Sequence, residues 1–205
     1  MTRHRRQTIL LLGPTASGKT PLGDALERCG AFGRHCRHFD FGEKLRVITN
    51  GDETGDLAEV EIAYLADTLA RGALLTNERF YLAKKILNDF LISVEDDALI
   101  IMNGLPRQLN QALEVDRILN VRAVIELSCS IDTIMARIVA DPDSDRMNRN
   151  DDDETLVERK LAIYETETKQ LRDHYRRYGA QITTIEVKAD TTAMDVVKLL
   201  PKSFD

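Results

Sequence analysis

Residues 13–20 read GPTASGKT and match the pattern G-x-x-x-x-G-K-[ST]. They directly follow the apolar segment 8–12, which has the composition of a buried strand. In this pattern successive backbone N–H groups cradle phosphate oxygens, so residues 13–20, the phosphate loop, predict a nucleotide-binding site. We expect the phosphates to contact Gly13, Ala16, Ser17, Gly18, Lys19 and Thr20.

The fixed positions of the phosphate loop have separate physical roles. Gly13 and Gly18 allow backbone conformations that a Cβ atom disfavours. Lys19 can place its charge between the β- and γ-phosphates, and the Thr20 hydroxyl can ligate Mg²⁺. A helix predicted over residues 21–28 would direct the positive end of its dipole at the same anion. The alternative interpretation is a glycine-rich turn before an ordinary helix.

Two arginines that follow later apolar segments suggest a second ligand. Arg46 comes after the candidate strand 36–39, and Arg107 comes after the candidate strand 98–102. Because the carboxyl ends of parallel strands share one edge of a sheet, both arginines can lie beside the phosphate loop. Two guanidinium groups in that place would bind a second phosphorylated molecule.

The segments that would position these residues alternate between short apolar runs and helical patterns. This alternation is typical of a parallel sheet covered by helices, so we predict an α/β fold with helices on both faces of the sheet. Five strands are expected, at residues 8–12, 36–39, 98–102, 121–127 and 182–187.

Helix boundaries are indicated by capping residues. We expect Asn77 to cap a helix that ends near Leu91, and Ser130 to precede a helix over 131–140. A long helix should run from Asp152 to the stop at Gly179, with a core-facing stripe of Val157, Leu161, Tyr164, Thr168, Leu171, Tyr175 and Tyr178. A capping box of Thr192 and Asp195 should begin the last helix, which ends before Pro201.

Length and composition bound the possible classes of function. The 205 residues suit one domain, and the aromatic content of 5% without Trp implies an aliphatic core. A net charge of −6 argues against a nucleic-acid backbone as the main partner. A local basic cleft can still bind a small anion. We interpret Arg3, Arg5 and Arg6 as a solvated tail rather than a contact with nucleic acid.

The chain contains no signal for export or membrane insertion. The apolar segment 9–12 is too short for a signal-peptide core, and no segment approaches membrane-spanning length. An odd number of cysteines without framework spacing fits a reducing compartment, so a cytoplasmic location is expected. A metal site at Cys29, His35, Cys36 and His38 is disfavoured, because a closed zinc site needs a second ligand pair and none follows.

Taken together, these segments resemble the adenylate kinase family of nucleoside monophosphate kinases, nearly end to end. Besides the phosphate loop, FGEKLR at 41–46 is similar to the family pattern T-G-D-x-L-R. NGLPR at 103–107, with Gln111, is similar to D-G-[FY]-P-R-x-x-x-Q. RNDD at 149–152 is similar to the R-x-D-D pattern of the lid, and RGALL at 71–75 resembles the segment beside the acceptor base.

The resemblance implies a fold and a reaction. The fold would be a single P-loop NTPase domain, residues 1–205, with an acceptor-binding insertion at about 41–73. A short lid at about 141–153 would lack the cysteine-bearing zinc insert of some relatives. The reaction would be transfer of the γ-phosphoryl group of ATP, with Mg²⁺, to a nucleoside monophosphate by a monomeric enzyme. Such chemistry consists mostly of positioning and neutralisation of charge.

Roles for individual residues follow from the same resemblance. Lys19 and Thr20 would hold the donor and Mg²⁺, while Arg46 and Arg107 would grip the acceptor phosphate. Gln111 would hydrogen-bond the acceptor base and favour AMP, because the pyrimidine-specific relatives carry Asn there. The acceptor site would be completed by Phe41, Gly42, Leu74 and Gly104. Two further arginines, Arg137 on the ATP side and Arg149 in the lid, would close over the transferring group.

The chain also departs from the family pattern. Asn103 stands where the family has an aspartate that orients water on Mg²⁺, so any contact of Asn103 with the metal would be weak and through water. Phe41 replaces a threonine, and Lys160 stands where a lid-side arginine is expected, with Arg159 next to it. Asp141 takes the place of a second arginine, for which Arg146 could compensate. These departures imply reduced activity or a different acceptor.

Two other functions are consistent with the phosphate loop. A nucleotide-binding regulatory protein with weakened catalysis is favoured by Asn103, Phe41 and Lys160. The string GPTASGKT is also similar to the loop of tRNA dimethylallyltransferases. That family would need a longer chain and a basic RNA-binding face, whereas this chain is acidic.

Overall fold

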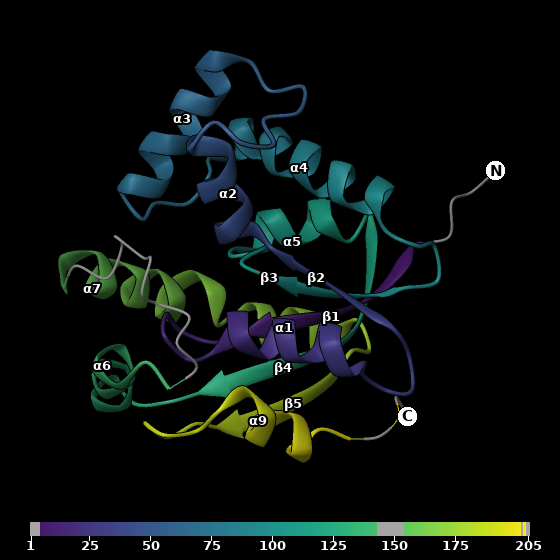
Figure 1. Cartoon of the computed structure of the whole chain (residues 1–205), viewed down its shortest axis with the longest axis vertical. Helices are drawn as coiled ribbons and strands as arrows, with labels where there is room; N and C mark the ends of the chain where they lie inside the picture. The colour runs from purple at the N-terminus through teal and green to yellow at the C-terminus, as the bar shows by residue number, and fades with distance from the viewer. Residues whose placement is uncertain (1–4, 143–153, 202, 204–205) are drawn as a thin grey trace.

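Five parallel strands form one sheet in the order β2-β3-β1-β4-β5 (Figure 1). The computed structural model describes residues 5–142, 154–201 and 203. The strands are β1 (Arg6–Leu12), β2 (Cys36–Asp40), β3 (Leu99–Asn103), β4 (Leu119–Ser128) and β5 (Gln181–Glu186). Each overlaps a predicted strand, so the expected α/β fold with a five-stranded parallel sheet is confirmed. The phosphate loop follows β1, the middle strand.

Strand β1 is buried on both faces, which explains its continuous apolar sequence. Ile9 and Leu11 point to the face covered by α1 (Lys19–Cys29) and α9 (Ala193–Leu199). Leu10 and Leu12 point to the opposite face, covered by α4 (Phe80–Ser93), α5 (Leu109–Val115) and α8 (Leu171–Arg177). Two apolar layers therefore hold the strand that carries the phosphate loop.

The predicted insertion, residues 41–73, contains two helices that pack together. Helix α2 (Phe41–Thr49) starts directly after β2, and α3 (Glu59–Ala70) follows it. Figure 1 shows α2 and α3 on the same side of the sheet as α4, away from α1 and α9. Buried apolar side chains of α2, α3 and α4 belong to one core cluster. The segment is thus attached to the sheet at the end of β2.

Two predicted helix boundaries are wrong. Asn77 does not cap α4: it begins a short 3₁₀ turn, η1 (Asn77–Arg79), and no side chain caps either element in this described segment. Such turns commonly form the first turn of a helix. The predicted long helix is divided into α7 (Glu154–Ile163), the π-helical turn η2 (Tyr164–Thr168) and α8. Within the predicted stripe, Tyr164, Leu171 and Tyr175 are buried, whereas Tyr178 is 73% exposed because α8 ends at Arg177.

The other caps agree with the sequence. Helix α6 (Ile131–Ala140) begins after Ser130, whose hydroxyl accepts a hydrogen bond from the Thr133 N–H. Thr192 and Asp195 form the capping box of α9. Gly179 has a φ of +84° and follows α8, as expected for a glycine that ends a helix.

The cysteines and histidines near the second strand have structural contacts. Cys36 is buried, and burial raises the pKa of its thiol to about 11. His38 Nδ1 lies 2.8 Å from the Asp24 carboxylate. Within residues 5–142, 154–201 and 203, no group of three or more His, Cys, Asp or Glu side chains is placed to hold a metal ion. No helix in the same residues is long and apolar enough to cross a membrane.

Removal of the Leu22 side chain tests the packing of α1 on the sheet. Leu22 is fully buried, so Leu22→Ala leaves a cavity and should lower the free energy of unfolding by about 2–5 kcal/mol. The matched control is Leu199→Ala, because Leu199 is 65% exposed and its truncation should cost less than about 1 kcal/mol. Urea denaturation measures both. Equal effects would contradict the described burial of α1.

Candidate active site

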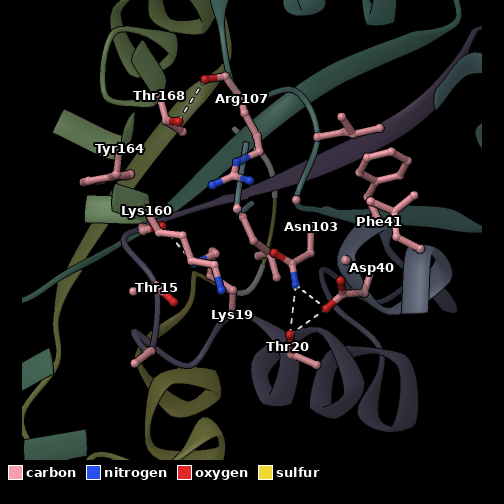
Figure 2. Close-up of a pocket in the computed structure, with 18 of the residues that line it drawn as sticks. Thr15, Lys19, Thr20, Asp40, Phe41, Asn103, Arg107, Lys160, Tyr164 and Thr168 are labelled. Carbon is pink, nitrogen blue, oxygen red and sulfur yellow. Dashed lines mark hydrogen bonds between the residues drawn. The ribbon is translucent and has the colours of Figure 1, made fainter. Parts of the chain in front are cut away.

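The predicted site residues converge on one cleft at the carboxyl edge of the sheet (Figure 2). It encloses about 1430 Å³, solvent at its mouth included. Its lining includes Gly13, Ala16, Gly18, Lys19, Thr20, Phe41, Gly42, Arg46, Leu74, Asn103, Gly104, Arg107, Gln111 and Arg137. Ser17 is buried behind the loop and does not line the cleft, and Arg149 lies outside the described residues.

The phosphate loop has the backbone that its glycines predict. Gly13 and Gly18 have φ angles of +146° and +94°. A Cβ atom at Gly13 would lie 2.7 Å from the Leu127 carbonyl oxygen, so only glycine fits there. Lys19 Nζ donates to the carbonyl oxygens of Gly13 (2.8 Å) and Pro14 (2.6 Å). The ammonium group therefore lies inside the curve of the loop, next to the space where an anion would bind.

Arg137 of α6 links the phosphate loop to the end of the sheet. Its Nε donates to the Ala16 carbonyl at 2.9 Å, and its Nη1 donates to the carbonyls of Lys188 (2.7 Å) and Thr191 (2.8 Å). The side chain is only 3% exposed. In this structure Arg137 braces the loop, and its contact with a transferring group stays a prediction.

Arg46 and Arg107 bring two guanidinium groups to the other part of the cleft. Neither guanidinium has a hydrogen-bond or ion-pair partner in the part of the chain that the structure describes. Figure 2 shows the Arg107 side chain extending into the cleft on the side of Lys160 and Lys19. Desolvation by burial lowers the pKa of Arg107. A desolvated guanidinium without a counter-charge gains strongly from an anionic ligand.

The backbone of Arg107 is held by two side chains. Gln111 Oε1 accepts from its N–H at 2.9 Å, and the Thr168 hydroxyl donates to its carbonyl at 2.8 Å. Gln111 Nε2 also donates to the Leu75 carbonyl at 3.4 Å. Thus Gln111 joins the Arg107 loop to the segment at 71–75, and its contact with an acceptor base stays a prediction. Sequence analysis placed Thr168 only in the core-facing stripe of the predicted long helix and did not indicate its contact with Arg107.

Thr20 belongs to a hydrogen-bonded triangle with Asp40 and Asn103, which Figure 2 shows. The Thr20 hydroxyl donates to Asp40 Oδ2 at 2.5 Å. Asn103 Nδ2 donates to the same oxygen at 2.7 Å and to Thr20 Oγ1 at 3.2 Å. The other carboxylate oxygen of Asp40 accepts from the Glu43 N–H and caps α2. Sequence analysis missed Asp40, although its position at the end of β2 was a signal.

The chemistry of this triangle fits a magnesium ion that is bound together with a nucleotide. Mg²⁺ prefers oxygen ligands and is commonly held by one or two carboxylates plus phosphate oxygens and water. The triangle offers one hydroxyl and one carboxylate beside the phosphate loop. Its residues would therefore hold the ion only with the help of phosphate oxygens.

Comparisons with known proteins found adenylate kinases among the similar sequences. The chain is 27% identical to an adenylate kinase of Prochlorococcus marinus strain MIT 9303 over 202 residues, which cover 95% of this chain and 99% of that protein. It is 25% identical to adenylate kinase 1 of Drosophila melanogaster, with 96% of this chain and 79% of that protein covered. The chain is thus similar to adenylate kinases over almost its whole length. A comparison with models of protein families found no match.

Among solved structures, a gluconokinase from Sinorhizobium meliloti 1021 has a similar fold. Its TM-score is 0.53 at 14% identity, and the match covers 95% of this chain and 90% of the gluconokinase. This likeness supports the fold alone, which is the α/β fold of P-loop NTPases. The similarity to curated adenylate kinases, rather than this structural likeness, supports the resemblance that the motifs indicated.

The residues that depart from the adenylate kinase pattern do not all line the cleft. Phe41 is buried, with its ring centroid 6.4 Å from that of Phe39, and it also lines the cleft. Lys160 lines the cleft, whereas Arg159 is exposed and does not. Asp141 lines the cleft as well, and Arg146 lies outside the described residues. Lys160, rather than Arg159, is thus the cation that α7 brings to this site.

Tyr164, which sequence analysis assigned to the core, also lines the cleft. Its hydroxyl donates to Glu126 Oε1 at 3.4 Å. Burial, and then the nearby Glu126 carboxylate, raise the pKa of this tyrosine, so it stays neutral. Tyr164, in the π turn η2, thus lies where the core meets the edge of the site.

Loss of either clamp arginine should weaken the binding of a ligand that spans the cleft. Two adenosines joined by five phosphates are a suitable probe. Arg46→Ala and Arg107→Ala should each lower its affinity about ten- to hundredfold, since a hydrogen bond to a charged group contributes about 1.5–3 kcal/mol. Isothermal titration calorimetry at fixed ionic strength measures the change.

The control for this experiment is Arg177→Ala, because Arg177 is exposed on α8 and does not line the cleft. Its affinity for the probe should equal that of the unmodified protein. ATP alone should bind all three variants with similar affinity, since its phosphates belong in the phosphate loop. Full affinity of Arg46→Ala and Arg107→Ala for the probe would remove both residues from the ligand site.

Proposed function

We propose that this protein is an ATP-dependent nucleoside monophosphate kinase that transfers the γ-phosphoryl group of ATP to AMP, with Mg²⁺. The observation that carries the proposal is that two guanidinium groups, which have no hydrogen-bond or ion-pair partner among the described residues, share a cleft with a phosphate loop. One region can bind the phosphates of a donor, and the other can bind the phosphate of an acceptor. Homology to adenylate kinases over almost the whole chain supports the same reaction.

The protein's contribution to this reaction is positioning and electrostatics. Phosphoryl transfer needs the acceptor oxygen in line with the bond that breaks, and needs negative charge on the equatorial oxygens to be stabilised. Lys19 and the loop N–H groups would hold the donor, and Arg46 with Arg107 would hold the acceptor. Mg²⁺, when bound with ATP beside Thr20, would neutralise charge on the β- and γ-phosphates.

Low solvent exposure increases the effect of these charges. A fixed cation in a water-excluded site stabilises developing negative charge more strongly than one in bulk water, and it needs little reorganisation. Arg107 is partly buried, and its backbone is held at both the N–H and the carbonyl. Arg137 would act on the same charge through the shape of the phosphate loop that it braces.

The preference for AMP and the assignment of segments are also proposals. In this assignment α2 and α3 belong to the acceptor-binding insertion at 41–73, and Leu74 with Gln111 lies at its base. The segment at 141–153, which carries Arg149, would be the lid, and most of it lies outside the described residues. We further propose a monomeric, cytoplasmic enzyme.

The test of the proposal is an assay with ATP, Mg²⁺ and a panel of AMP, GMP, CMP, UMP and dTMP. Chromatography of the products should show a nucleoside diphosphate formed from the acceptor, fastest with AMP. Gluconate belongs in the panel because the structural neighbour is a gluconokinase. ATP binding without phosphorylation of any monophosphate would contradict the proposal. That result would instead favour a nucleotide-binding regulatory protein.

A substitution at Lys19 tests the phosphate loop in this reaction. Lys19→Met should lower kcat at least about a hundredfold, since a preorganised charge at a transition state contributes several kcal/mol. The melting temperature should change little, because Lys19 lies on the wall of the cleft. Lys198→Met is the control, since Lys198 lies on α9 with 70% of its side chain exposed. Unchanged turnover in Lys19→Met would exclude the loop from catalysis.

A further inference from the structure

Asp40 and Asn103 are neighbours across two strands. They are the last residues of β2 and β3, and they are paired in the register of the sheet. Sequence analysis assigned the metal contact to Thr20 and Asn103. We propose instead that Asp40 supplies the carboxylate of the Mg²⁺ site, from the position paired with 103. This inference rests on the proposed function, because the ion would enter with ATP.

The hydrogen bonds identify which atoms could face a cation. The oxygen Oδ2 of Asp40 can only accept, so Asn103 must present its N–H group to it, at 2.7 Å. The same Nδ2 lies 3.2 Å from Thr20 Oγ1. An amide N–H group cannot ligate a cation. Asn103 therefore orients the carboxylate through its N–H group, and the oxygens that meet in the triangle belong to Asp40 and Thr20.

The charge of Asp40 gives an independent reason. Its side chain is 8% exposed, and no Lys, Arg or His nitrogen in the described part of the chain forms a salt bridge with it. Burial of a carboxylate without a counter-charge is costly, and three hydrogen bonds offset that cost only in part. A divalent cation that arrives with the nucleotide would supply the missing charge.

Helix capping is the competing explanation for an aspartate at position 40, but the cap and the contacts with Thr20 and Asn103 use different carboxylate oxygens. The cap of α2 is formed by Oδ1, which accepts from the Glu43 N–H at 3.0 Å. The contacts with Thr20 and Asn103 are formed by Oδ2. Asparagine is as good an N-cap as aspartate, so Asp40→Asn keeps the cap on Oδ1 and removes the charge together with the acceptor oxygen Oδ2. The two roles can therefore be separated by one substitution.

The experiment measures the affinity of Mn²⁺ for the complex of protein and ATP. With protein in excess over ATP, the electron paramagnetic resonance signal of free Mn²⁺ gives the dissociation constant. Asp40→Asn should weaken Mn²⁺ binding at least about tenfold. The exchange variant Asp40→Asn/Asn103→Asp returns a carboxylate to the paired position, and its affinity should come within about threefold of the unmodified protein. Asp190→Asn, at an exposed site, is the charge-matched control.

The outcomes separate this inference from the proposed function. Calorimetry in EDTA should show that all variants bind metal-free ATP alike, and thermal unfolding should show that they are folded. Mn²⁺ affinity unchanged by Asp40→Asn would overturn the inference and leave the kinase proposal intact. An exchange variant that binds Mn²⁺ no better than Asp40→Asn would overturn the claim that both positions face one cation. Failure of the unmodified protein to phosphorylate a nucleotide would instead count against the kinase.

Discussion

The parallel pairing of β1 with β3, and of β3 with β2, brings three chain segments to one edge of the sheet. The phosphate loop leaves β1 there, Asp40 ends β2, and Asn103 precedes the loop that carries Arg107. All proposed contacts with phosphate depend on this arrangement, because the carboxyl end of β3 would lie at the opposite edge if β3 ran antiparallel to β1 and β2. The two apolar layers around β1 hold the arrangement in place.

Charge is organised differently in the cleft and on the rest of the molecule. Outside the cleft many charged groups are paired: Glu95 binds Arg37, Lys84 binds Glu114, and the buried Glu126 lies 3.4 Å from Arg172. In the cleft the guanidinium groups of Arg46 and Arg107 and the carboxylate of Asp40 have no ion-pair partner in the described residues. A net charge of −6 therefore says little about the ligand. Opposite charges that are close but unpaired suit a ligand that carries both a metal ion and phosphates.

The parts that sequence analysis predicted correctly depend on local patterns. Strand β1 is a continuous apolar run, the phosphate loop is a contiguous motif, and Ser130 and Thr192 lie one residue before their helices. The convergence of Arg46 and Arg107 on one cleft also followed, because parallel strands leave few alternatives for where their ends lie. These predictions needed only spacing and residue type.

The errors and omissions arise from tertiary contacts. The π turn at Tyr164–Thr168 adds no breaking residue to the sequence, so helical periodicity was extended through it to Tyr178. The brace formed by Arg137 uses carbonyls of Ala16, Lys188 and Thr191, which are distant in the chain. The hydrogen bond from Gln111 to the Leu75 carbonyl likewise depends on how α5 packs against the segment at 71–75. Such contacts have no signature in a single sequence.

A carboxylate at position 40 can take the place of one at position 103 because the two positions are paired in the sheet. Adjacent strands lie about 4.8 Å apart, so a carboxylate that moves from one to the other shifts by roughly the length of a water bridge. Mg²⁺ usually retains several of its water ligands, and a water molecule can connect it to an acid on either strand. The carboxylate would approach the ion from the other strand, while the net charge around the ion would stay the same. Asn103 is then better understood as a residue that orients Asp40 than as a loss of function at the metal site.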